Sequence, residues 1–216
     1  MDFWSYIIAA VAGYFLGSLP TGFLVAKAKG VDIRSVGSGN IGATNVFRIL
    51  GKRAGVFVLV VDGLKGWVAG ALVSEFVLDH FSSAKDLQTL EGLKIISGIC
   101  AILGHNYTCW LGFKGGKGIA TTAGVLAALF PKVFLTALAM FAVVFAGTRF
   151  VSMGSMAAAV ALPVAAWLFE YSRRMIVVAA VMGALAIYKH KGNIQRLLNG
   201  TETRVRFRRK PPEETK

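Results

Sequence analysis

The sequence predicts an all-α integral membrane protein with seven transmembrane helices. Hydrophobic residues make up 55% of the 216 residues and only 16% are charged, whereas a soluble domain of this length needs more charge to cover its surface. The apolar residues also form runs close to the ~20 residues with which a helix crosses a bilayer. We expect one membrane-embedded domain over residues 1–202 and a basic polar tail over residues 203–216.

The apolar runs predict the seven spans in chain order. The first is expected to be a retained helix rather than a cleaved signal peptide, because it begins with Asp2 and continues through Pro20. The stretch 118–148 is too long for one span, and Pro131 offers a turn that divides it. The shorter half is expected to begin as a loop entering the membrane. The expected spans are residues 3–26, 54–78, 92–112, 118–130, 132–148, 152–169 and 175–189.

The distribution of positive charge predicts the orientation of these spans. With seven spans, 18 Lys and Arg residues fall on the face that carries residues 27–53 and the C-terminal tail, 5 fall on the other face, and Lys65 lies within a span. Because cytoplasmic loops carry the excess of Lys and Arg, we expect the N-terminus outside and the C-terminus in the cytoplasm. The net charge of +13 then indicates anionic lipid and anionic substrates rather than nucleic acid.

The basic tail has two interpretations at this stage. Its cations either lie along the anionic inner leaflet or belong to a solvated terminus without a specific role. The residues concerned are Arg204, Arg206, Arg208, Arg209 and Lys210.

The loop VGSGNIGATN, residues 36–45, has the composition of an anion site, because glycines let backbone N–H groups approach a ligand closely. Its GSGNIG matches the dinucleotide pattern G-x-G-x-x-G, but that fingerprint requires a βαβ unit, and the flanks here are membrane spans. Arg48 follows the loop and can bind a phosphate through two hydrogen bonds. The candidate ligands are Gly37, Ser38, Gly39, Asn40, Thr44, Asn45 and Arg48.

A second glycine-rich loop, GFKGGKG, spans residues 112–118. It fails the ATPase pattern G-x-x-x-x-G-K-[ST], because Leu111 and Gly118 stand where Gly and Ser or Thr are required. Lys114 and Lys117 still lie among four glycines, Gly115 and Gly116 included, at the start of a helix, which is typical of an anion site. Either glycine-rich loop alone is equally well explained as a tight turn between spans.

Two further polar clusters follow. Residues 189–202 contain His190 and Asn193, which share a helix face at a spacing of three residues, and end in Glu202. Residues 148–156 contribute Ser152 and Ser155. Seven spans put all four polar clusters at one membrane face, which favours a single site.

Several other polar residues are expected to be structural. Asp62 and Lys65 lie within one span at a spacing of three, so each neutralises the other. His105 lies within the third expected span, where it either contacts substrate or, as we favour, is a satisfied structural histidine. Cys100 and Cys109 are expected to be reduced, buried thiols. The sequence has no cluster of metal-ligand spacing, so no metal and no cofactor are expected.

Three segments resemble the motifs of the bacterial acyl-phosphate:glycerol-3-phosphate acyltransferase family. They are LGSLPTGFLVAKAKGVDIRSVGSGNIGATNVFR, GHNYTCWLGFKGGKGIAT and HKGNIQRLLNGTE, and the resemblance runs over residues 10–202. It implies a seven-helix enzyme of the bacterial inner membrane with its site at the cytoplasmic face. The implied reaction moves a fatty acyl group from acyl phosphate to the 1-hydroxyl of sn-glycerol 3-phosphate, giving lysophosphatidic acid and phosphate in the first acylation of phospholipid synthesis.

The resemblance also implies residue roles. The implied partners are acyl phosphate, glycerol 3-phosphate and membrane lipid, while the oligomeric state stays open. Gly192 departs from the glutamate that many members carry at this position. The expected catalytic residues are Ser38, Lys117, Ser155, His190 and Asn193, and the expected substrate-binding residues are Gly37, Gly39, Asn40, Thr44, Arg48, Gly115, Gly116 and Glu202.

Two alternative functions belong to other classes of protein. A transporter for a phosphorylated solute or lipid would show an internal repeat and polar residues near the membrane midplane, whereas the polar clusters here are predicted at one face. A membrane scaffold without activity gives no reason for two anion-binding loops.

Overall fold

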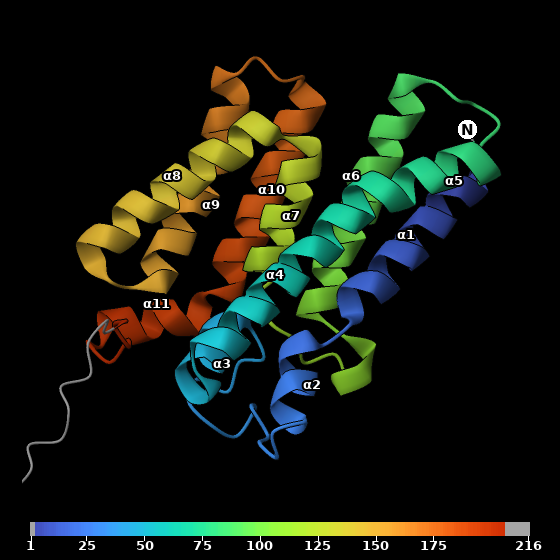
Figure 1. Cartoon of the computed structure of the whole chain (residues 1–216). Helices are drawn as coiled ribbons and strands as arrows, with labels where there is room; N and C mark the ends of the chain where they lie inside the picture. Colours follow the sequence, from blue (N-terminus) through green and yellow to red (C-terminus); the bar gives the residue numbers. More distant parts are fainter. Residues whose placement is uncertain (1–2, 206–216) are drawn as a thin grey trace, which may run out of the picture.

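The computed structural model describes residues 3–205, and within that range the chain is helical and contains no β-strand (Figure 1). The all-helical prediction is therefore confirmed. The elements are α1 (Phe3–Ser18), α2 (Thr21–Lys27), α3 (Ala43–Leu50), α4 (Lys52–Val68), the π-helical turn η1 (Ala69–Val73), α5 (Ser74–Phe81), α6 (Leu87–Asn106), the 3₁₀ turn η2 (Cys109–Leu111), α7 (Ile119–Leu129), α8 (Pro131–Thr148), α9 (Val151–Leu168), α10 (Arg173–Lys189) and α11 (Lys191–Leu198).

Within residues 3–205, five helical segments are long and apolar enough to cross a membrane. A sixth arises if α10 and α11, which meet at an angle of 54°, count as one span. The expected span over residues 118–130 is α7, whose 11 residues reach only ~17 Å across a hydrocarbon core of ~30 Å. The prediction of seven spans and that of the orientation of the termini stay predictions. The five segments are Phe3–Lys27, Lys52–Phe81, Leu87–Leu111, Pro131–Thr148 and Val151–Leu168.

Pro131 divides the long apolar stretch as expected. It begins α8, where the missing N–H of proline costs nothing because the first turn of a helix leaves its N–H groups unpaired. The first span is also broken, between α1 and α2 at Leu19 and Pro20, and η1 interrupts the second span.

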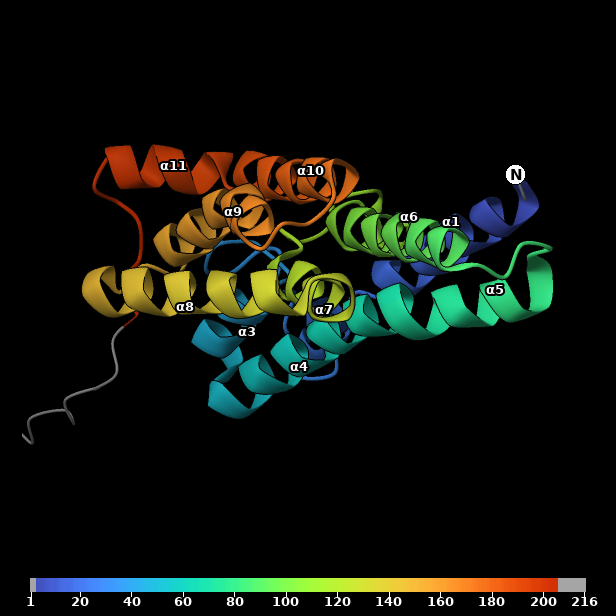
Figure 2. The same cartoon turned by 90° about the horizontal axis from the view of Figure 1, so that it is seen from above.

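Glycines bring the helices close together. A Cβ at Gly17 of α1 would lie 2.0 Å from the carbonyl oxygen of Ala101 in α6, and a Cβ at Gly124 of α7 would lie 1.9 Å from that of Gly63 in α4. Such close approach by small residues is how helices associate in lipid. It fixes α1 on α6 and α7 on α4, while α9 packs between α8 and α10. Figure 2 shows α7 between α4 on one side and the pair α9 and α10 on the other.

The apolar core has three parts, and one of them holds the first glycine-rich loop in place. The largest lies among α6 to α10 around the fully buried Phe130. A second packs α1 and α5 against α6. The third buries Ile33 and Ile41 of the loop against Val46 of α3 and Val58 of α4, so residues 28–42 are anchored rather than free.

The predicted pair of Asp62 and Lys65 is confirmed. The Lys65 Nζ lies 2.9 Å from the Asp62 Oδ1, and the two side chains are 4% and 2% exposed. The Lys65 Nζ also donates a hydrogen bond to the Leu19 carbonyl at 2.8 Å, which ties the break in the first span to α4. Cys100 and Cys109 are free thiols, as expected, but they are half-buried rather than buried.

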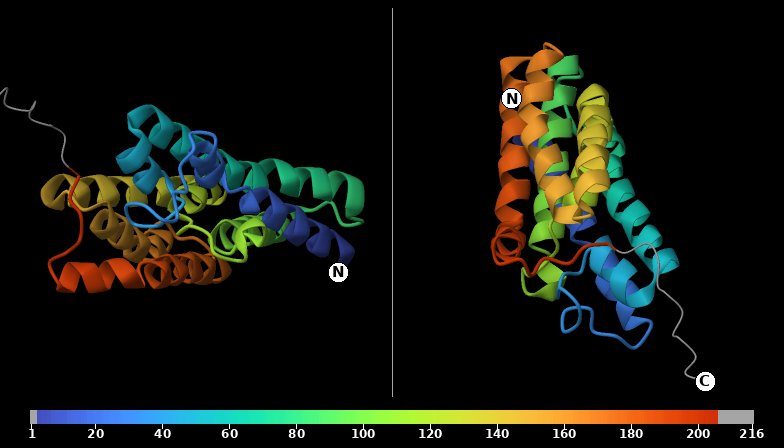
Figure 3. Two further views of the ribbon diagram at one scale, coloured as in Figure 1. Left: turned by 90° about the horizontal axis from the view of Figure 1, so that it is seen from below. Right: turned by 90° about the vertical axis from the view of Figure 1, so that its left-hand side faces the viewer.

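One end of the bundle collects the polar segments, and we refer to it as the polar end. It carries α2, α3, α11 and the loops of residues 28–42 and 107–118, whereas α1 begins at the opposite end (Figures 1 and 3). The segment after α11 runs across this end (Figure 3), where the Val205 N–H donates to the Arg149 carbonyl at 3.0 Å. Arg204 lies over the Phe150 ring at 5.0 Å. The other tail cations, at positions 206–210, lie outside the described residues.

Candidate active site

A cavity of about 410 Å³ opens at the polar end, and we refer to it as the main cavity. It brings together residues of all four polar clusters, which are distant in sequence. The predicted site residues that line it are Ser38, Asn40, Thr44, Arg48, Lys117, Ser155, His190, Asn193 and Glu202. The four predicted glycines, at positions 37, 39, 115 and 116, lie beside it rather than in its wall.

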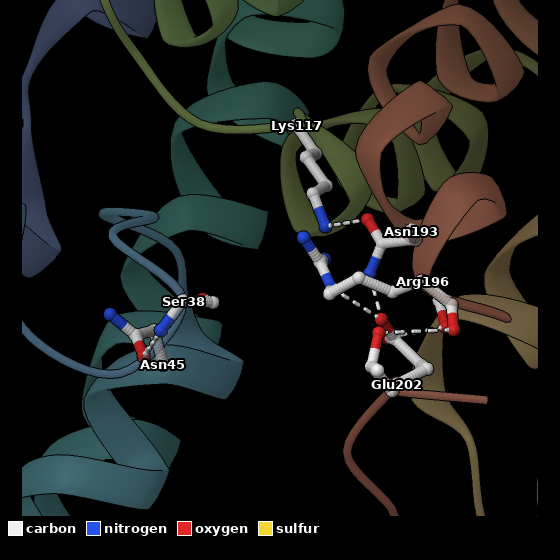
Figure 4. Close-up of polar contacts among 8 residues, drawn as sticks. Ser38, Asn45, Lys117, Asn193, Arg196 and Glu202 are labelled. Atoms are coloured by element: carbon white, nitrogen blue, oxygen red, sulfur yellow. Dashed lines mark hydrogen bonds and ion pairs between the residues drawn. The ribbon is translucent and has the colours of Figure 1, made fainter. Parts of the chain in front are cut away.

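A hydrogen-bond network centred on Glu202 forms one side of the main cavity (Figure 4). Its Oε1 accepts from the Asn193 Nδ2 at 2.7 Å and from the Ser152 Oγ at 2.9 Å. Its Oε2 accepts from the Arg196 Nε at 2.7 Å. The Asn193 Oδ1 in turn accepts from the Lys117 Nζ. Glu202 therefore fixes the Asn193 amide with its oxygen toward Lys117.

The charge state of the network follows from its environment. Burial and the nearby charge of Arg196 lower the pKa of Lys117 from 10.5 to about 8, against the opposing effect of Glu202. Burial alone would raise the pKa of Glu202, but the hydrogen bonds it accepts lower that pKa overall. At neutral pH Lys117 is therefore mostly a cation, and its hydrogen-bond partner is a neutral amide. Its charge remains available to attract an anion.

His190 lies at the bend between α10 and α11, and its side chain is buried in the cavity wall. The His190 Nδ1 lies 2.8 Å from the Ala186 carbonyl oxygen. Because a carbonyl only accepts, Nδ1 carries the proton, and Nε2 of the neutral ring is then a hydrogen-bond acceptor. Ser155, one helix away, donates to the Val151 carbonyl at 2.9 Å, which leaves its oxygen lone pairs to accept from a ligand.

The first glycine-rich loop is held by Asn45, which is 2% exposed. The Asn45 Oδ1 accepts from the Ser38 N–H at 3.0 Å (Figure 4). Its Nδ2 donates to three loop carbonyls, those of residues 33, 36 and 40, at 3.0–3.2 Å. The expectation that Asn45 donates to an anion is therefore wrong. Gly37 is required here because its φ is +62° and a Cβ would lie 2.3 Å from the Asn45 Oδ1.

The second glycine-rich loop packs on the end of α6. The Gly115 N–H donates to the Asn106 carbonyl at 3.2 Å and the Gly116 N–H to the His105 carbonyl at 3.0 Å. Both N–H groups are therefore occupied by main-chain carbonyls, and the substrate-binding role expected of Gly115 and Gly116 stays a prediction. A Cβ at Gly116 would lie 2.2 Å from the His105 Nε2. The glycines thus let the loop lie close enough to α6 to direct Lys117 into the main cavity.

Five polar residues of the cavity wall, Thr203 among them, were given neither a catalytic nor a ligand role from the sequence. Ser152 and Arg196 lie within the predicted polar clusters and bind Glu202. The spacing of Arg196 three residues after Asn193, on one helix face, was the available signal for Arg196. Asp62 and His105 also reach the cavity. The His105 Nδ1 lies 3.7 Å from the Asp62 Oδ1, and this proximity has no signature in the sequence.

Apolar side chains also line the main cavity. They include Phe47 of α3, Val56 and Leu59 of α4, and Phe141 and Phe145 of α8. Several of these side chains are also exposed on the outer surface of the bundle, among them Phe47 at 42% and Leu59 at 51%. The cavity therefore suits a ligand with an anionic head and an apolar chain.

Comparison with known proteins gives one family. The family model described as glycerol-3-phosphate acyltransferase matches residues 7–200. A glycerol-3-phosphate acyltransferase of Geotalea daltonii is 44% identical over 198 residues, covering 92% of this chain and 96% of that protein. The corresponding protein of Aquifex aeolicus is 40% identical over 199 residues, covering 92% and 98%.

Solved structures agree with the sequence comparison. The crystal structure of PlsY (YgiH), described as an integral membrane glycerol 3-phosphate acyltransferase, has a TM-score of 0.82 and 40% identity in its glycerol 3-phosphate form. That form covers 94% of this chain and 96% of the solved chain. The lysophosphatidic acid form gives a TM-score of 0.80 and 39% identity with the same coverage.

Proposed function

The chain belongs to the glycerol-3-phosphate acyltransferase family, and we propose that it transfers a fatty acyl group from acyl phosphate to the 1-hydroxyl of sn-glycerol 3-phosphate. The products are lysophosphatidic acid and inorganic phosphate, and the reaction is the first acylation of phospholipid synthesis. The observation that carries the proposal is the main cavity itself, which is lined both by cationic and by apolar side chains. No metal and no cofactor takes part.

The membrane placement belongs to the same proposal. The protein lies in the bacterial inner membrane with seven spans. The short helix α7 is the fourth of them in chain order and completes that number. The N-terminus is outside, and the polar end faces the cytoplasm. The excess of Lys and Arg in the segments of the polar end supports this orientation.

Acyl phosphate binds with its acyl chain along the apolar side, among Phe47, Leu59 and Phe145. Its phosphate lies against the Lys117 ammonium and the Ser38 hydroxyl. The half-exposed surface of this apolar side supports entry of the donor from the lipid, because an acyl chain then never has to leave an apolar environment.

Glycerol 3-phosphate binds on the polar side. Arg48, at the C-terminal turn of α3, holds its phosphate through two hydrogen bonds. His190, Asn193 and Ser155 orient its glycerol hydroxyls. The rigid Asn193 amide supports this assignment, since Glu202 already fixes its orientation.

The reaction is a direct displacement. The 1-hydroxyl oxygen attacks the acyl carbonyl carbon, and the bond from that carbon to the phosphate oxygen breaks. The hydroxyl proton passes to an oxygen of the departing phosphate, while the His190 Nε2 accepts a hydrogen bond that aims the hydroxyl. Lys117 stabilises the negative charge that develops on the leaving phosphate. Acyl phosphate is already activated, so most of the acceleration comes from positioning the two substrates.

The test uses the purified full chain in lipid vesicles with radiolabelled glycerol 3-phosphate and no added metal. Acyl phosphate and acyl-CoA are supplied in separate reactions, with Lys117→Ala as the inactive control. Lysophosphatidic acid formed from acyl phosphate alone supports the proposal. Product from acyl-CoA instead overturns the donor, and no product from either in folded protein overturns the activity.

A further inference from the structure

A second cavity of about 240 Å³ adjoins the main cavity, and we refer to it as the lysine cavity. Three lysines contribute to its wall, from the second glycine-rich loop and from the junction of α10 with α11. No acidic side chain lines it among the described residues. Its polar and aromatic lining includes Asn40, Tyr107, Lys117, Tyr188, Lys189 and Lys191.

Aromatic rings hold two of these ammonium groups without cancelling their charge. The Lys189 Nζ lies 4.3 Å from the centre of the Tyr107 ring, and the Lys191 Nζ lies 5.1 Å from that of the Tyr188 ring. The Lys189 Nζ also donates to the Asn106 carbonyl at 3.1 Å. An ammonium has three N–H donors, so both lysines keep donors for an anion.

The lysine cavity leads to the main cavity through shared residues. Asn40 and Lys117 are part of both walls, and Lys117 reaches toward Asn193 on the far side (Figure 4). The positive charge of Lys189 is close enough to contribute to lowering the pKa of Lys117. An anion that enters the lysine cavity therefore meets Lys117 before it meets the rest of the proposed catalytic residues.

The lining also distinguishes between the two phosphate-bearing substrates. The apolar residues of the main cavity, such as Phe145 and Leu59, are absent from the lysine cavity, whose wall is made of Lys, Asn, Gly and Tyr. Apart from the two tyrosine rings, an acyl chain has no apolar surface to cover there. A small phosphomonoester needs only the cations.

We propose that the lysine cavity is a separate phosphate-binding site that captures glycerol 3-phosphate from water and passes it to the main cavity. This inference rests on the proposed function. The cavity attracts the soluble substrate by charge and holds its phosphate between Lys189 and Lys191. The lipid-borne acyl phosphate reaches the main cavity from its apolar side and does not use this site.

The kinetic test compares the wild type with Lys189→Gln, Lys191→Gln and the double variant in vesicles of zwitterionic lipid. Removing two cations that attract a dianion is expected to raise the KM for glycerol 3-phosphate about tenfold and to weaken the salt dependence of kcat/KM. The KM for acyl phosphate is expected to stay within about twofold. Lys191→Arg restores the charge and the KM. Lys29→Gln, an equal loss of charge on an exposed side chain of the same end, is the matched control and leaves both KM values unchanged.

A binding measurement separates this inference from the proposed activity. Radiolabelled inorganic phosphate is titrated onto the full chain in the absence of acyl donor, and the double variant is expected to bind it about tenfold more weakly than the wild type and the Lys29→Gln control. Lys191 is exposed, so the Lys191→Gln variant keeps the test valid if loss of the Lys189 contact prevents folding. Unchanged phosphate binding and unchanged KM in folded variants overturn the site. Phosphate binding that responds to the lysines, in a protein that forms no lysophosphatidic acid, overturns the proposed function alone.

Discussion

The charge of Lys117 makes the activity depend on pH above neutrality. The pKa of this side chain is lowered to about 8 by burial and by neighbouring cations. Only the protonated amine attracts phosphate, so we expect kcat/KM to be high below pH 8 and to fall as the pH rises through that value. Below pH 7 Lys117 is already protonated in nearly all molecules, so a further fall in pH does not raise kcat/KM through this residue.

The size of the effect follows from that pKa. At pH 9 roughly a tenth of the molecules carry the cation, so kcat/KM falls about tenfold from its plateau, and by about tenfold for each further pH unit. A bound phosphate stabilises the cation and raises the pKa of Lys117 in the complex. The profile of kcat is therefore displaced to higher pH than the profile of kcat/KM.

The assay measures lysophosphatidic acid from radiolabelled glycerol 3-phosphate between pH 6 and pH 10, with the remaining acyl phosphate determined at each pH. Lys117→Arg is the informative variant because an arginine side chain stays charged throughout this range. Its activity is expected to be lower, since the guanidinium has a different shape, but its profile should lack the fall near pH 8. A wild-type kcat/KM that is flat to pH 10, or an identical fall in Lys117→Arg, would refute the role given to Lys117.

Three further outcomes follow from the described contacts. Lys65→Met leaves the buried Asp62 carboxylate without its lysine partner and is expected to destabilise the protein by about 3–5 kcal/mol. Combining it with Asp62→Asn is expected to recover most of that loss, so equal unfolding midpoints for the single and double variants in detergent would contradict the prediction. Gly116→Ala places a Cβ 2.2 Å from the His105 Nε2 and is expected to lower kcat/KM by about tenfold or more, because it displaces Lys117. Gly147→Ala is the control and is expected to leave kcat/KM unchanged, since its Cβ would meet nothing within 4 Å. Arg48→Ala is expected to raise the KM for glycerol 3-phosphate about 10- to 100-fold by removing a charge-assisted phosphate contact, and an unchanged KM would remove Arg48 from the site.

The fold class was predictable because composition and apolar run length act over whole segments. The order and number of these segments also predicted that the four polar clusters lie at one end of the bundle. The structure gathers nine predicted residues around one cavity at that end. The pairing of Asp62 with Lys65 was predictable because a spacing of three residues on a helix needs no tertiary information. The roles of the individual site residues stay predictions.

Other features depend on contacts that sequence spacing does not encode. Asn45 resembles a ligand by residue type, yet four bonds to its own loop occupy its amide. The N–H groups of Gly115 and Gly116 are likewise occupied by carbonyls of the preceding helix end. Hydrogen-bond donors are satisfied by whichever acceptor the folded chain brings near.

The position of Glu202 in the chain has a consequence for biosynthesis. Ribosomes make the chain from its N-terminus, so Lys117, Ser152, Asn193 and Arg196 are all translated before the carboxylate that organises them. A fragment truncated between the end of α11 and residue 202 retains the sequence of every described helix but lacks the group that orients Asn193. The site therefore cannot be complete until residue 202 has been translated. A stop codon between the end of α11 and residue 202 is expected to give a membrane-inserted but inactive protein.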